Sequence, residues 1–379
     1  MGFVAHARLR LFVPGARPTR APCRLAIASA KFACPGGQRH ALGVAQLDST
    51  GTVPCCIRWA MLLTSEQPAK MPRRINIMSN FLHLNDLSHA EIVSVLDRAD
   101  VLEQRWRDNQ MPQSLTRKKV GLWFWGQGFR NRVAFEIGAR AMGADVSYIP
   151  GELAVHEPIV DVSHYLDNWF SMLVIRCRSY EDLRRVATDS RVPVVNAKTN
   201  LNHPCEILGD LQYIRKKRRS LDDLRVVFVG EMTNLCMSWI EAAKALPIEV
   251  IQVGPRQSLM DEETLKAINA AAAGRVNISE SLEGSISSKT DVVYTDCWPV
   301  NGNADAVREQ FLPFQVTDDV LNRMSQDGFF LPCPPIVRGQ EVSAEAVSHP
   351  RFCSYEAKDY LLHAQNALME YCFSSDQEK

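Results

Sequence analysis

The chain has 379 residues, about twice or more the usual size of one domain, so its length predicts two domains. Hydrophobic residues make up 46% and charged residues 23%, which is ordinary globular usage and excludes collagen-like and wholly disordered proteins. No apolar run approaches the roughly 18 residues of a membrane-spanning helix. Basic and acidic side chains both number 43, and this zero formal charge provides no global field for nucleic acid. We expect neither a membrane nor a nucleic-acid partner.

The first 77 residues differ in composition from the rest. They hold eleven Lys and Arg but only two acids, Asp48 and Glu66, which gives a net charge of +9 against −9 for the remainder. This segment has no sustained helix or strand period, and patterned sequence begins abruptly at Asn80. Three interpretations stay open: an organelle transit peptide, a disordered basic arm, or translated upstream sequence with the natural start at Met71 or Met78.

The eleven cysteines are an odd number and include no CxxC pair. This pattern argues against a disulfide framework and against a zinc knuckle. It favours reduced thiols in the cytoplasm.

From residue 80, helix and strand signals alternate. Ser88 and Glu91 form the pattern of a capping box, and apolar residues at helical spacing follow as far as Trp106. A helix is predicted over 132–142, with Val133, Ile137 and Ala141 on one side. Short apolar runs predict strands at 120–125, 146–149, 173–175 and 192–195. This is the βαβ rhythm of a parallel sheet.

A second series begins near residue 224. Strands are predicted at 225–229, 249–253, 291–294 and 329–331, and helices at 238–246 and 357–371. The basic stretch 215–219 is interpreted as a solvated helix end or linker rather than a nucleic-acid patch. We therefore predict two parallel-sheet α/β domains, 78–215 and 216–345, followed by a C-terminal helical segment, 346–379, that packs back on the first domain.

Ligands of open parallel sheets bind beyond the carboxyl ends of the strands, so polar residues directly after each strand are candidates for a site. Gly128, Phe129, Arg130 and Asn131 follow the first predicted strand and open a helix. Glycine, free helix N–H groups and arginine charge predict an anion site, most naturally for phosphate. The alternative is a Gly-rich turn whose arginines pair with local acids such as Glu136.

Two further strand ends of the first series carry polar groups. Arg176 follows the strand at 173–175, and His203, Pro204, Cys205 and Glu206 follow the strand at 192–195 after a short loop. Arginines for a phosphate, with a histidine to hydrogen-bond a carbonyl, suit transfer from an acyl phosphate.

The second series supplies a different chemistry. Asn234 follows the strand at 225–229, but the GxGxxG spacing of a dinucleotide site is missing. Asp296 and Cys333 follow two other strands, where they could hold an amine and help take its proton. An ordinary small buried thiol is the alternative for Cys333.

Several of these residues, in order, carry a family resemblance. The chain reads Phe-Leu-His-Leu at 81–84, Arg-x-Arg-x-x-Phe-Glu at 130–136, His-Pro-Cys at 203–205, Asp-x-Trp at 296–298 and Cys-x-Pro at 333–335, with Arg176 and Asn234 between them. From about residue 80 to 373 it resembles the aspartate/ornithine carbamoyltransferases, and the last two motifs place it nearer the ornithine branch.

The resemblance implies a mechanism and a set of site residues. Carbamoyl phosphate would bind the first domain, with Arg130 and His203 in catalytic roles. The amine would bind the second domain, with Asp296 and Cys333 near the reaction. No metal or organic cofactor is implied. The family is trimeric with active sites at subunit contacts, so a homotrimer or a multiple of trimers is expected, and His156 could reach a neighbouring subunit. The residues implied for carbamoyl phosphate are Gly128, Phe129, Arg130, Asn131, Arg176, His203 and Glu206. Those implied for the amine are Asn234, Asp296, Val300, Asn301, Cys333 and Pro334.

The departures from the family pattern lie on both sides of this site. The family's Ser-Thr-Arg-Thr-Arg loop is Gly-Phe-Arg-Asn-Arg at 128–132, and Glu206 replaces a glutamine. An ionised Glu206 would repel a phosphate, so we expect it to be protonated or paired with an arginine. The family's Ser-Met-Gly appears as Val300, Asn301 and Gly302. Tyr360 stands where an arginine is expected, with one residue of alignment freedom.

These departures leave several hypotheses open. The first is a carbamoyltransferase acting on an amine other than ornithine, and the second is a catalytically inactive trimeric paralogue that binds a ligand or partner. A different acyl or phosphoryl donor is a further possibility. An unrelated dinucleotide enzyme is disfavoured by the missing glycine fingerprint.

Overall fold

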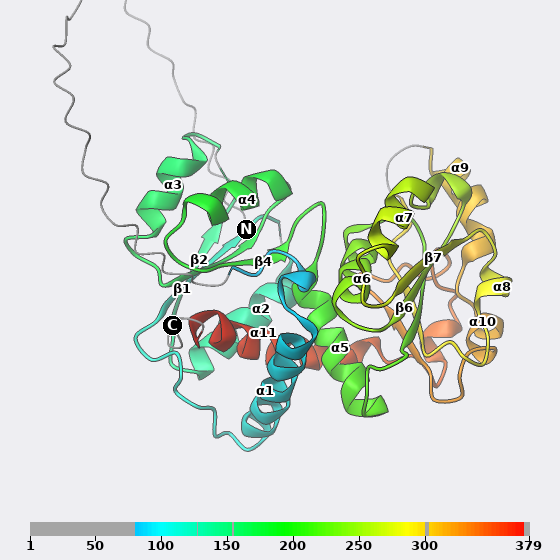
Figure 1. Ribbon diagram of the computed structural model, residues 1–379, viewed down its shortest axis with the longest axis horizontal. Coiled ribbons are helices and arrows are strands. Elements are labelled where there is room, and N and C mark those ends of the chain that lie inside the picture. Colours follow the sequence, from blue (N-terminus) through cyan, green and yellow to red (C-terminus); the bar gives the residue numbers. More distant parts are fainter. Residues whose placement is uncertain (1–79, 127, 154, 300–302, 375–379) are drawn as a thin grey trace, which may run out of the picture. The chain divides into compact units, whose positions relative to one another are not determined.

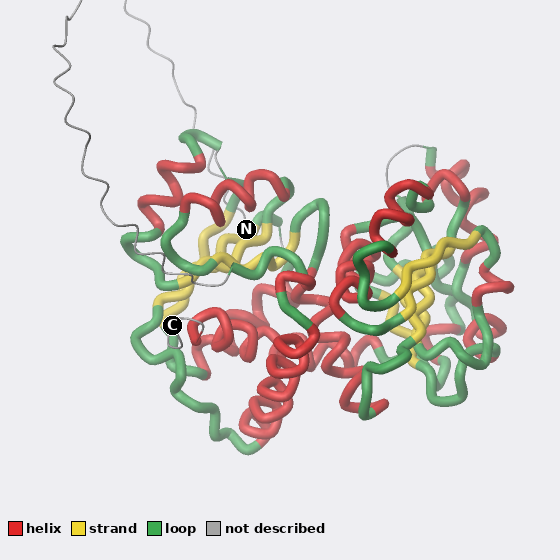
Figure 2. The backbone as a smooth tube through the Cα atoms, in the orientation of Figure 1, coloured by secondary structure: helices red, strands yellow, loops and turns green. Residues whose placement is uncertain are grey.

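The computed structural model describes residues 80–126, 128–153, 155–299 and 303–374, which belong to one compact unit, Pro72–Lys379. Two parallel sheets with helices on both faces organise this part of the chain (Figures 1 and 2). The fold class predicted from the sequence is thereby confirmed.

The first sheet has the strand order β2-β1-β3-β4 and is parallel throughout. Alternate residues of its strands point to opposite faces: Leu122 and Val174 pack toward α1, α2, α5 and α11, whereas Leu173 and Ile175 pack toward α3 and α4. The strands are β1 (Lys119–Phe124), β2 (Asp145–Pro150), β3 (Met172–Arg176) and β4 (Val194–Lys198). The helices are α1 (His89–Arg107), α2 (Phe129–Ala141), α3 (Ile159–Leu166), α4 (Tyr180–Asp189), α5 (Pro204–Arg218) and α11 (Ser354–Ser374).

The second sheet has the order β7-β6-β5-β8-β9 and is also parallel. Val226 and Phe228 face the side of α6, and Val227 and Val229 face α8 and α10. The strands are β5 (Arg225–Val229), β6 (Glu249–Val253), β7 (Arg275–Ser279), β8 (Val292–Thr295) and β9 (Phe329–Pro332). The helices are α6 (Asn234–Ala245), α7 (Glu262–Asn269), α8 (Leu282–Ser285), α9 (Ala304–Phe311) and α10 (Asp318–Asn322).

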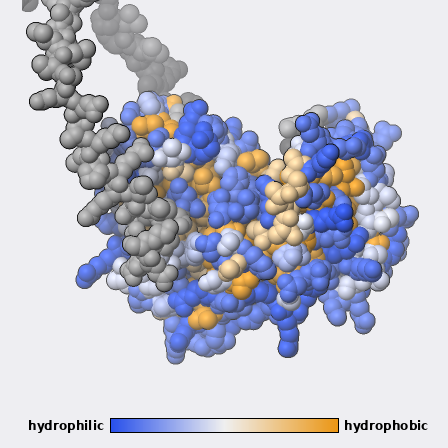
Figure 3. Space-filling model, in the orientation of Figure 1, coloured by the Kyte–Doolittle hydropathy of each residue, from blue (hydrophilic) through white to orange (hydrophobic). Residues whose placement is uncertain are grey.

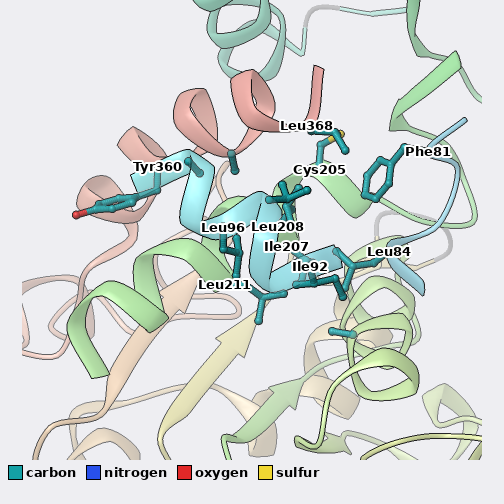
Figure 4. Close-up of a cluster of buried hydrophobic side chains, with 14 of the residues drawn as sticks. Phe81, Leu84, Ile92, Leu96, Cys205, Ile207, Leu208, Leu211, Tyr360 and Leu368 are labelled. Carbon is teal, nitrogen blue, oxygen red and sulfur yellow. The ribbon is translucent and has the colours of Figure 1, made fainter. Parts of the chain in front are cut away.

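Helix α11 returns from the second domain to pack on the first, as predicted. It lies against α5, α1 and α2. Figure 4 shows part of the resulting core, with Leu96 of α1, Leu208 of α5 and Leu368 of α11 in one buried cluster. The start of α1 is also as predicted, because Ser88 and Glu91 form both hydrogen bonds of the capping box. The sequence therefore predicted both α1, near the beginning of the described chain, and α11, near its end.

The orientation of α2 differs from the pattern seen in the sequence. Val133 and Ile137, on the side taken as apolar, are 39% and 42% exposed. The buried side carries Ala134 and Gly138, where a Cβ on the glycine would collide with the side chain of Asn366 in α11. Small residues let two helices approach closely, so close packing rather than side-chain hydrophobicity sets the buried face.

Two strands were located incompletely from the sequence. β7 was missed, because it is an edge strand in which only Val276 is buried. β4 was expected to end at Val195, but it continues to Lys198. The apolar run ends before Asn196, which is polar but buried and donates to the carbonyl of Leu82 at 2.9 Å. A satisfied buried amide can therefore stand within a strand.

The basic stretch 215–219 forms the end of α5 and its cap. Arg215 pairs with Asp97 and Asp100 of α1 at 2.7 Å each, and Lys216 pairs with Glu103 at 3.0 Å. Cations at the C-terminal end of a helix also complement its dipole. The stretch is a helix end, as interpreted. Its first two charges are not simply solvated, because they form ion pairs that join α5 to α1.

Hydrogen bonds donated by first-domain residues to α6 hold the two domains together. The carboxylate of Glu241 in α6 accepts from the backbone of Leu84 at 3.0 Å, from Asn202 at 2.8 Å and from His83 at 2.7 Å. Ser238 of the same helix accepts from the backbone N–H of His203 at 2.8 Å. The start of α5 is thus fixed against the second domain.

The surface is mixed in character. Hydrophilic side chains cover most of the face seen in Figure 3, with hydrophobic residues scattered among them. Within the described ranges, no helix is long and apolar enough to cross a membrane.

Gly138→Ala tests the close packing of α2 on α11. Although alanine favours helix by about 1 kcal/mol, we expect a net loss of about 1–3 kcal/mol in the free energy of unfolding, measured by urea denaturation. Adding Asn366→Ala removes the obstructing amide, which has no hydrogen-bond partner among the described residues, and should recover stability. Ile137→Ala on the exposed side is the control. A more stable Gly138→Ala protein would contradict this packing.

Candidate active site

One cleft of about 890 Å³ opens where the carboxyl ends of the two sheets face each other. Every sequence-predicted site residue that the structure describes lies along it; Val300 and Asn301 fall outside the described residues. Those lining residues are Gly128, Phe129, Arg130, Asn131, Arg176, His203, Glu206, Asn234, Asp296, Cys333 and Pro334. The structure therefore brings the two sets of strand-end residues into a single space.

Gly128 and Arg176 form the floor of the first-domain side. Gly128 caps α2 with φ 35°, in the left-handed region that favours glycine, and a Cβ there would lie 2.7 Å from Nε of Arg176. The guanidinium of Arg176 thus rests against the turn, and its buried Nε lacks a hydrogen-bond partner among the described residues. Burial lowers the pKa of Arg176. A cation beside a helix N-terminus is suited to bind an anion.

The two arginines of α2 have different partners. Arg132 pairs with Glu136 at 3.3 Å, which is the local pairing considered as the alternative. Arg130 instead donates from Nη2 to the carbonyl of Pro334 at 2.8 Å, across the cleft. Its guanidinium also lies 4.8 Å from the ring centre of Phe129. Arg130 is therefore held by a contact across the cleft, whereas Arg132 is held by a local acid.

His203 is a neutral imidazole. It caps α5, and burial lowers its pKa to about 3 despite the opposing charge of Glu206. Its buried Nδ1 has no hydrogen-bond partner among the described residues, and Nε2 lies 3.7 Å from Glu206 Oε2. A neutral imidazole can donate one hydrogen bond without adding charge, which suits it to a carbonyl oxygen.

Glu206 is ionised through an unexpected partner. Lys358 of α11 lies 2.7 Å from Glu206 and 2.9 Å from Asp210, so the expected arginine is replaced by a lysine. Although burial opposes ionisation, this ammonium lowers the pKa of Glu206 to about 2. Burial raises the pKa of Asp210 to about 6, and Tyr294 donates to this carboxyl at 2.9 Å. One lysine therefore compensates two acids beneath the cleft.

The second-domain wall is acidic. Asp296 follows β8, and its Oδ1 accepts from the backbone of Cys297 at 2.9 Å. Burial raises the pKa of Asp296, and burial and the charge of Asp296 together raise that of Glu231. Burial also raises the pKa of the Cys333 thiol, so it stays protonated. Carboxylates with raised pKa values can both hold an amine and accept its proton.

Two predicted ligand residues have their amides engaged elsewhere. Asn131 donates to the carbonyl of Ala197 and accepts from Gln365, each at 3.0 Å. Asn234 donates to the carbonyl of Thr199 at 2.7 Å, joining the start of α6 to the end of β4. Because the side-chain amide of Asn131 is already engaged, its backbone N–H is the group that remains for an anion.

Sequence reasoning missed two lysines of this region. Lys198 lines the cleft at the end of β4, and the strand-end rule would have found it had the strand not been ended at Val195. Lys358 precedes the position where Tyr360 was noted in place of an arginine. Tyr360 instead stacks edge-on against Tyr213, with ring centres 5.4 Å apart. The cation of α11 is present, two residues earlier than Tyr360.

Arg176 beside a helix N-terminus, a neutral histidine and an acidic wall lie along one cleft, and this chemistry suits an anionic donor and an amine. Two family models match the chain: the aspartate/ornithine carbamoyltransferase carbamoyl-phosphate-binding domain at residues 79–216, and the aspartate/ornithine-binding domain at residues 222–372. The ornithine carbamoyltransferase of Chlorobaculum tepidum is 30% identical over 307 residues, covering 78% of this chain and 90% of that protein.

Other relatives agree. The ornithine carbamoyltransferase of Methanothermobacter thermautotrophicus is 31% identical over 308 residues, covering 78% of this chain and 98% of that protein. The solved structure of the Pyrococcus furiosus ornithine carbamoyltransferase superimposes with a TM-score of 0.72 at 26% identity, over 76% of this chain and 95% of that chain. The chain therefore belongs to the aspartate/ornithine carbamoyltransferase family. It is a carbamoyltransferase.

Lys358→Met tests the buried charge group. Removing the ammonium leaves Glu206 and Asp210 without their shared cation, so we expect the free energy of unfolding at neutral pH to fall by about 3–5 kcal/mol. In the unchanged protein the Lys358 ammonium lowers the pKa of Glu206 from its ordinary value of 4.5 to about 2. The ionised carboxylate therefore stabilises the fold fully above pH 4.5, and this stabilisation is lost as the pH falls toward 2. The difference between the two proteins should therefore shrink in acid.

The matched control is Lys289→Met, which removes an exposed lysine. Denaturant unfolding at several pH values measures both variants. A loss for Lys358→Met that is the same at acid and neutral pH would show that lost packing, and not the charge group, is responsible.

Proposed function

We propose that this enzyme transfers the carbamoyl group of carbamoyl phosphate to an amine other than ornithine. The observation that carries the proposal is that neutral His203, whose Nδ1 has no hydrogen-bond partner among the described residues, lines the same cleft as Arg176 and Asp296. Donor, carbonyl and amine each have a group of matching chemistry in the same cleft.

The first domain, 78–215, would hold the donor. The phosphate would lie at the N-terminus of α2, over Gly128 and Asn131, between the guanidiniums of Arg130 and Arg176. His203 would donate a hydrogen bond to the carbamoyl oxygen, where negative charge develops during attack. Glu206 does not oppose the phosphate with a full charge, because Lys358 compensates it.

The second domain, 216–345, would hold the acceptor. The neutral amine nitrogen attacks the carbamoyl carbon, a carbon–nitrogen bond forms, and the bond from that carbon to the phosphate oxygen breaks. Asp296 would position the amine and accept the proton that leaves it. Cys333, protonated as burial requires, would contact the amine without acting as a nucleophile.

The acceptor is proposed to differ from ornithine because the residues of its head-group pocket differ. Val300 supplies no side-chain hydrogen bond where the family has serine, and Asn301 replaces methionine. An acceptor head group left without its partners costs several kcal/mol, enough to depress ornithine use by orders of magnitude.

Assembly and location are also proposed from the family pattern. We expect a homotrimer or a multiple of trimers in the cytoplasm, with His156 near a subunit contact. Exposed apolar side chains of the first domain support an interface there, among them Val160, Tyr165 and Trp169. Light scattering on the purified protein measures the assembly.

A panel of amines tests the reaction itself. Full-length protein with carbamoyl phosphate should form a ureido product with at least one amine, read colorimetrically, and should use ornithine poorly. Val300→Ser with Asn301→Met should recover trace ornithine activity. Ornithine turnover near about 10² per second by the unmodified protein would refute the altered specificity. Failure with every amine, together with no calorimetric binding of phosphate or carbamoyl phosphate, would favour the inactive paralogue.

His203→Ala tests the carbonyl contact. We expect kcat to fall by roughly 10²–10³ with little change in folding, because the hydrogen bond to the developing charge is lost. Arg130→Ala should chiefly weaken donor binding, seen in the KM for carbamoyl phosphate. His164→Ala, at an exposed histidine, is the matched control. Full turnover by His203→Ala together with unfolding of Arg130→Ala would show that both residues are structural.

A further inference from the structure

Lys198 stands out because its charge has no counter-ion in close contact. Its side chain lines the cleft at the carboxyl end of β4 and is partly buried. Among the described residues its ammonium makes no hydrogen bond and no ion pair within 4 Å. Burial, together with the neighbouring charge of Arg176, lowers the pKa of Lys198, and the charge of Asp296 acts in the opposite direction. A desolvated cation facing a cleft is a binding group for an anion.

The backbone around Lys198 is fixed on both sides. Its carbonyl accepts from Cys177 at 3.0 Å, and its Cα is paired in register with Arg176 of β3. The carbonyl of the next residue, Thr199, accepts from Asn234 of the second domain at 2.7 Å. Lys198 thus sits where the anion floor of the first domain meets the acceptor side of the second.

One cation of the cleft is not needed for the donor phosphate. Among the described residues, three cations line the cleft: Arg130, Arg176 and Lys198. Of the acids that line it, Glu206 is compensated by Lys358, and Asp296 and Glu231 are left for the amine. The two arginines flank the helix N-terminus and match the two negative charges of a phosphate. Lys198 is then left for a second anion, and the only other molecule in the reaction is the acceptor.

The same position disfavours a second ammonium on the acceptor. Lys198 and Asp296 interact electrostatically, so the charge of Asp296 is already partly offset. An acceptor with one amine and a carboxylate can give the amine to Asp296 and the carboxylate to Lys198. A diamino acid would bring its additional ammonium into the field of Lys198, where like charges repel.

We propose that Lys198 determines acceptor specificity by binding a carboxylate, so that the acceptor is a monoamino carboxylic acid rather than a diamino acid or a simple amine. This inference rests on the proposed carbamoyl transfer and narrows its acceptor.

Matched acceptors separate the two requirements. Pentylamine, 5-aminopentanoate and ornithine share one chain length and differ only in the carboxylate and the second ammonium. The corresponding sets with three and four carbons, and aspartate and glutamate as α-amino carboxylates, extend the test to other shapes. With carbamoyl phosphate as donor, kcat/KM for the preferred monoamino acid should exceed that of its amine and diamino counterparts by about tenfold or more.

Variants then assign the effect to Lys198. Lys198→Met should lower kcat/KM for the monoamino acid by about 10- to 100-fold, mainly through KM, and leave the simple amine nearly unchanged. Lys198→Arg keeps the charge and should retain the preference. Lys289→Met, at an exposed lysine, should behave as the unchanged protein. Calorimetric binding of inorganic phosphate should be the same in all four proteins.

The outcomes are distinct. A diamino acid or simple amine as the best acceptor, no carboxylated amine accepted by a protein that binds phosphate, or loss of phosphate binding in Lys198→Met would each overturn the role given to Lys198. The last result would assign the lysine to the donor site. Failure with every amine, together with absence of phosphate binding by the unchanged protein, would instead overturn the proposed function.

Discussion

The ammonium of Lys358, buried between Glu206 and Asp210, is the interaction on which the site depends. It joins α11 to α5, and Tyr294 extends the contact to β8 of the second domain. Two unpaired carboxylates at this depth would cost several kcal/mol each, and they would also repel a phosphate bound above them. Because the lysine is present, Glu206 can be ionised next to an anion site, while burial keeps His203 beside it neutral. The group of Lys358, Glu206 and Asp210 thus contributes both to the stability of the fold and to the charge balance of the site.

Local pattern was sufficient for most of the fold and much of the site. Strand runs and a capping box located the elements, and the carboxyl-end rule selected residues that the structure brings into one cleft. The rule works because parallel strands end at the same edge of a sheet, so that sequence-distant loops become neighbours. It failed at Lys198 because the apolar run stops at Val195, and only tertiary hydrogen bonds allow the polar Asn196 to continue β4 in a buried position.

Other features depend on contacts between distant segments and have no local signal. Lys358 lies 152 positions from Glu206, and nothing in its own helix distinguishes a lysine that meets two acids from one that meets solvent. The buried face of α2 was misjudged similarly, since Gly138 is favoured by the approach of Asn366 and not by hydrophobicity. Buried charges and close helix contacts are properties of pairs, whereas periodicity describes one segment at a time.

The altered phosphate loop can be understood from the contacts that replace its hydroxyls. The guanidinium of Arg130 packs against the ring of Phe129 and donates a hydrogen bond to the carbonyl of Pro334, the residue after Cys333. Because these two contacts already fix the position of Arg130, fewer hydroxyls in the loop would be needed to orient a donor. In the proposed reaction this arrangement would couple donor and acceptor, because any shift of Arg130 toward a bound phosphate would change its hydrogen bond to Pro334. The loop has lost hydroxyl donors but keeps the charge of Arg130, which Phe129 and the carbonyl of Pro334 hold in place.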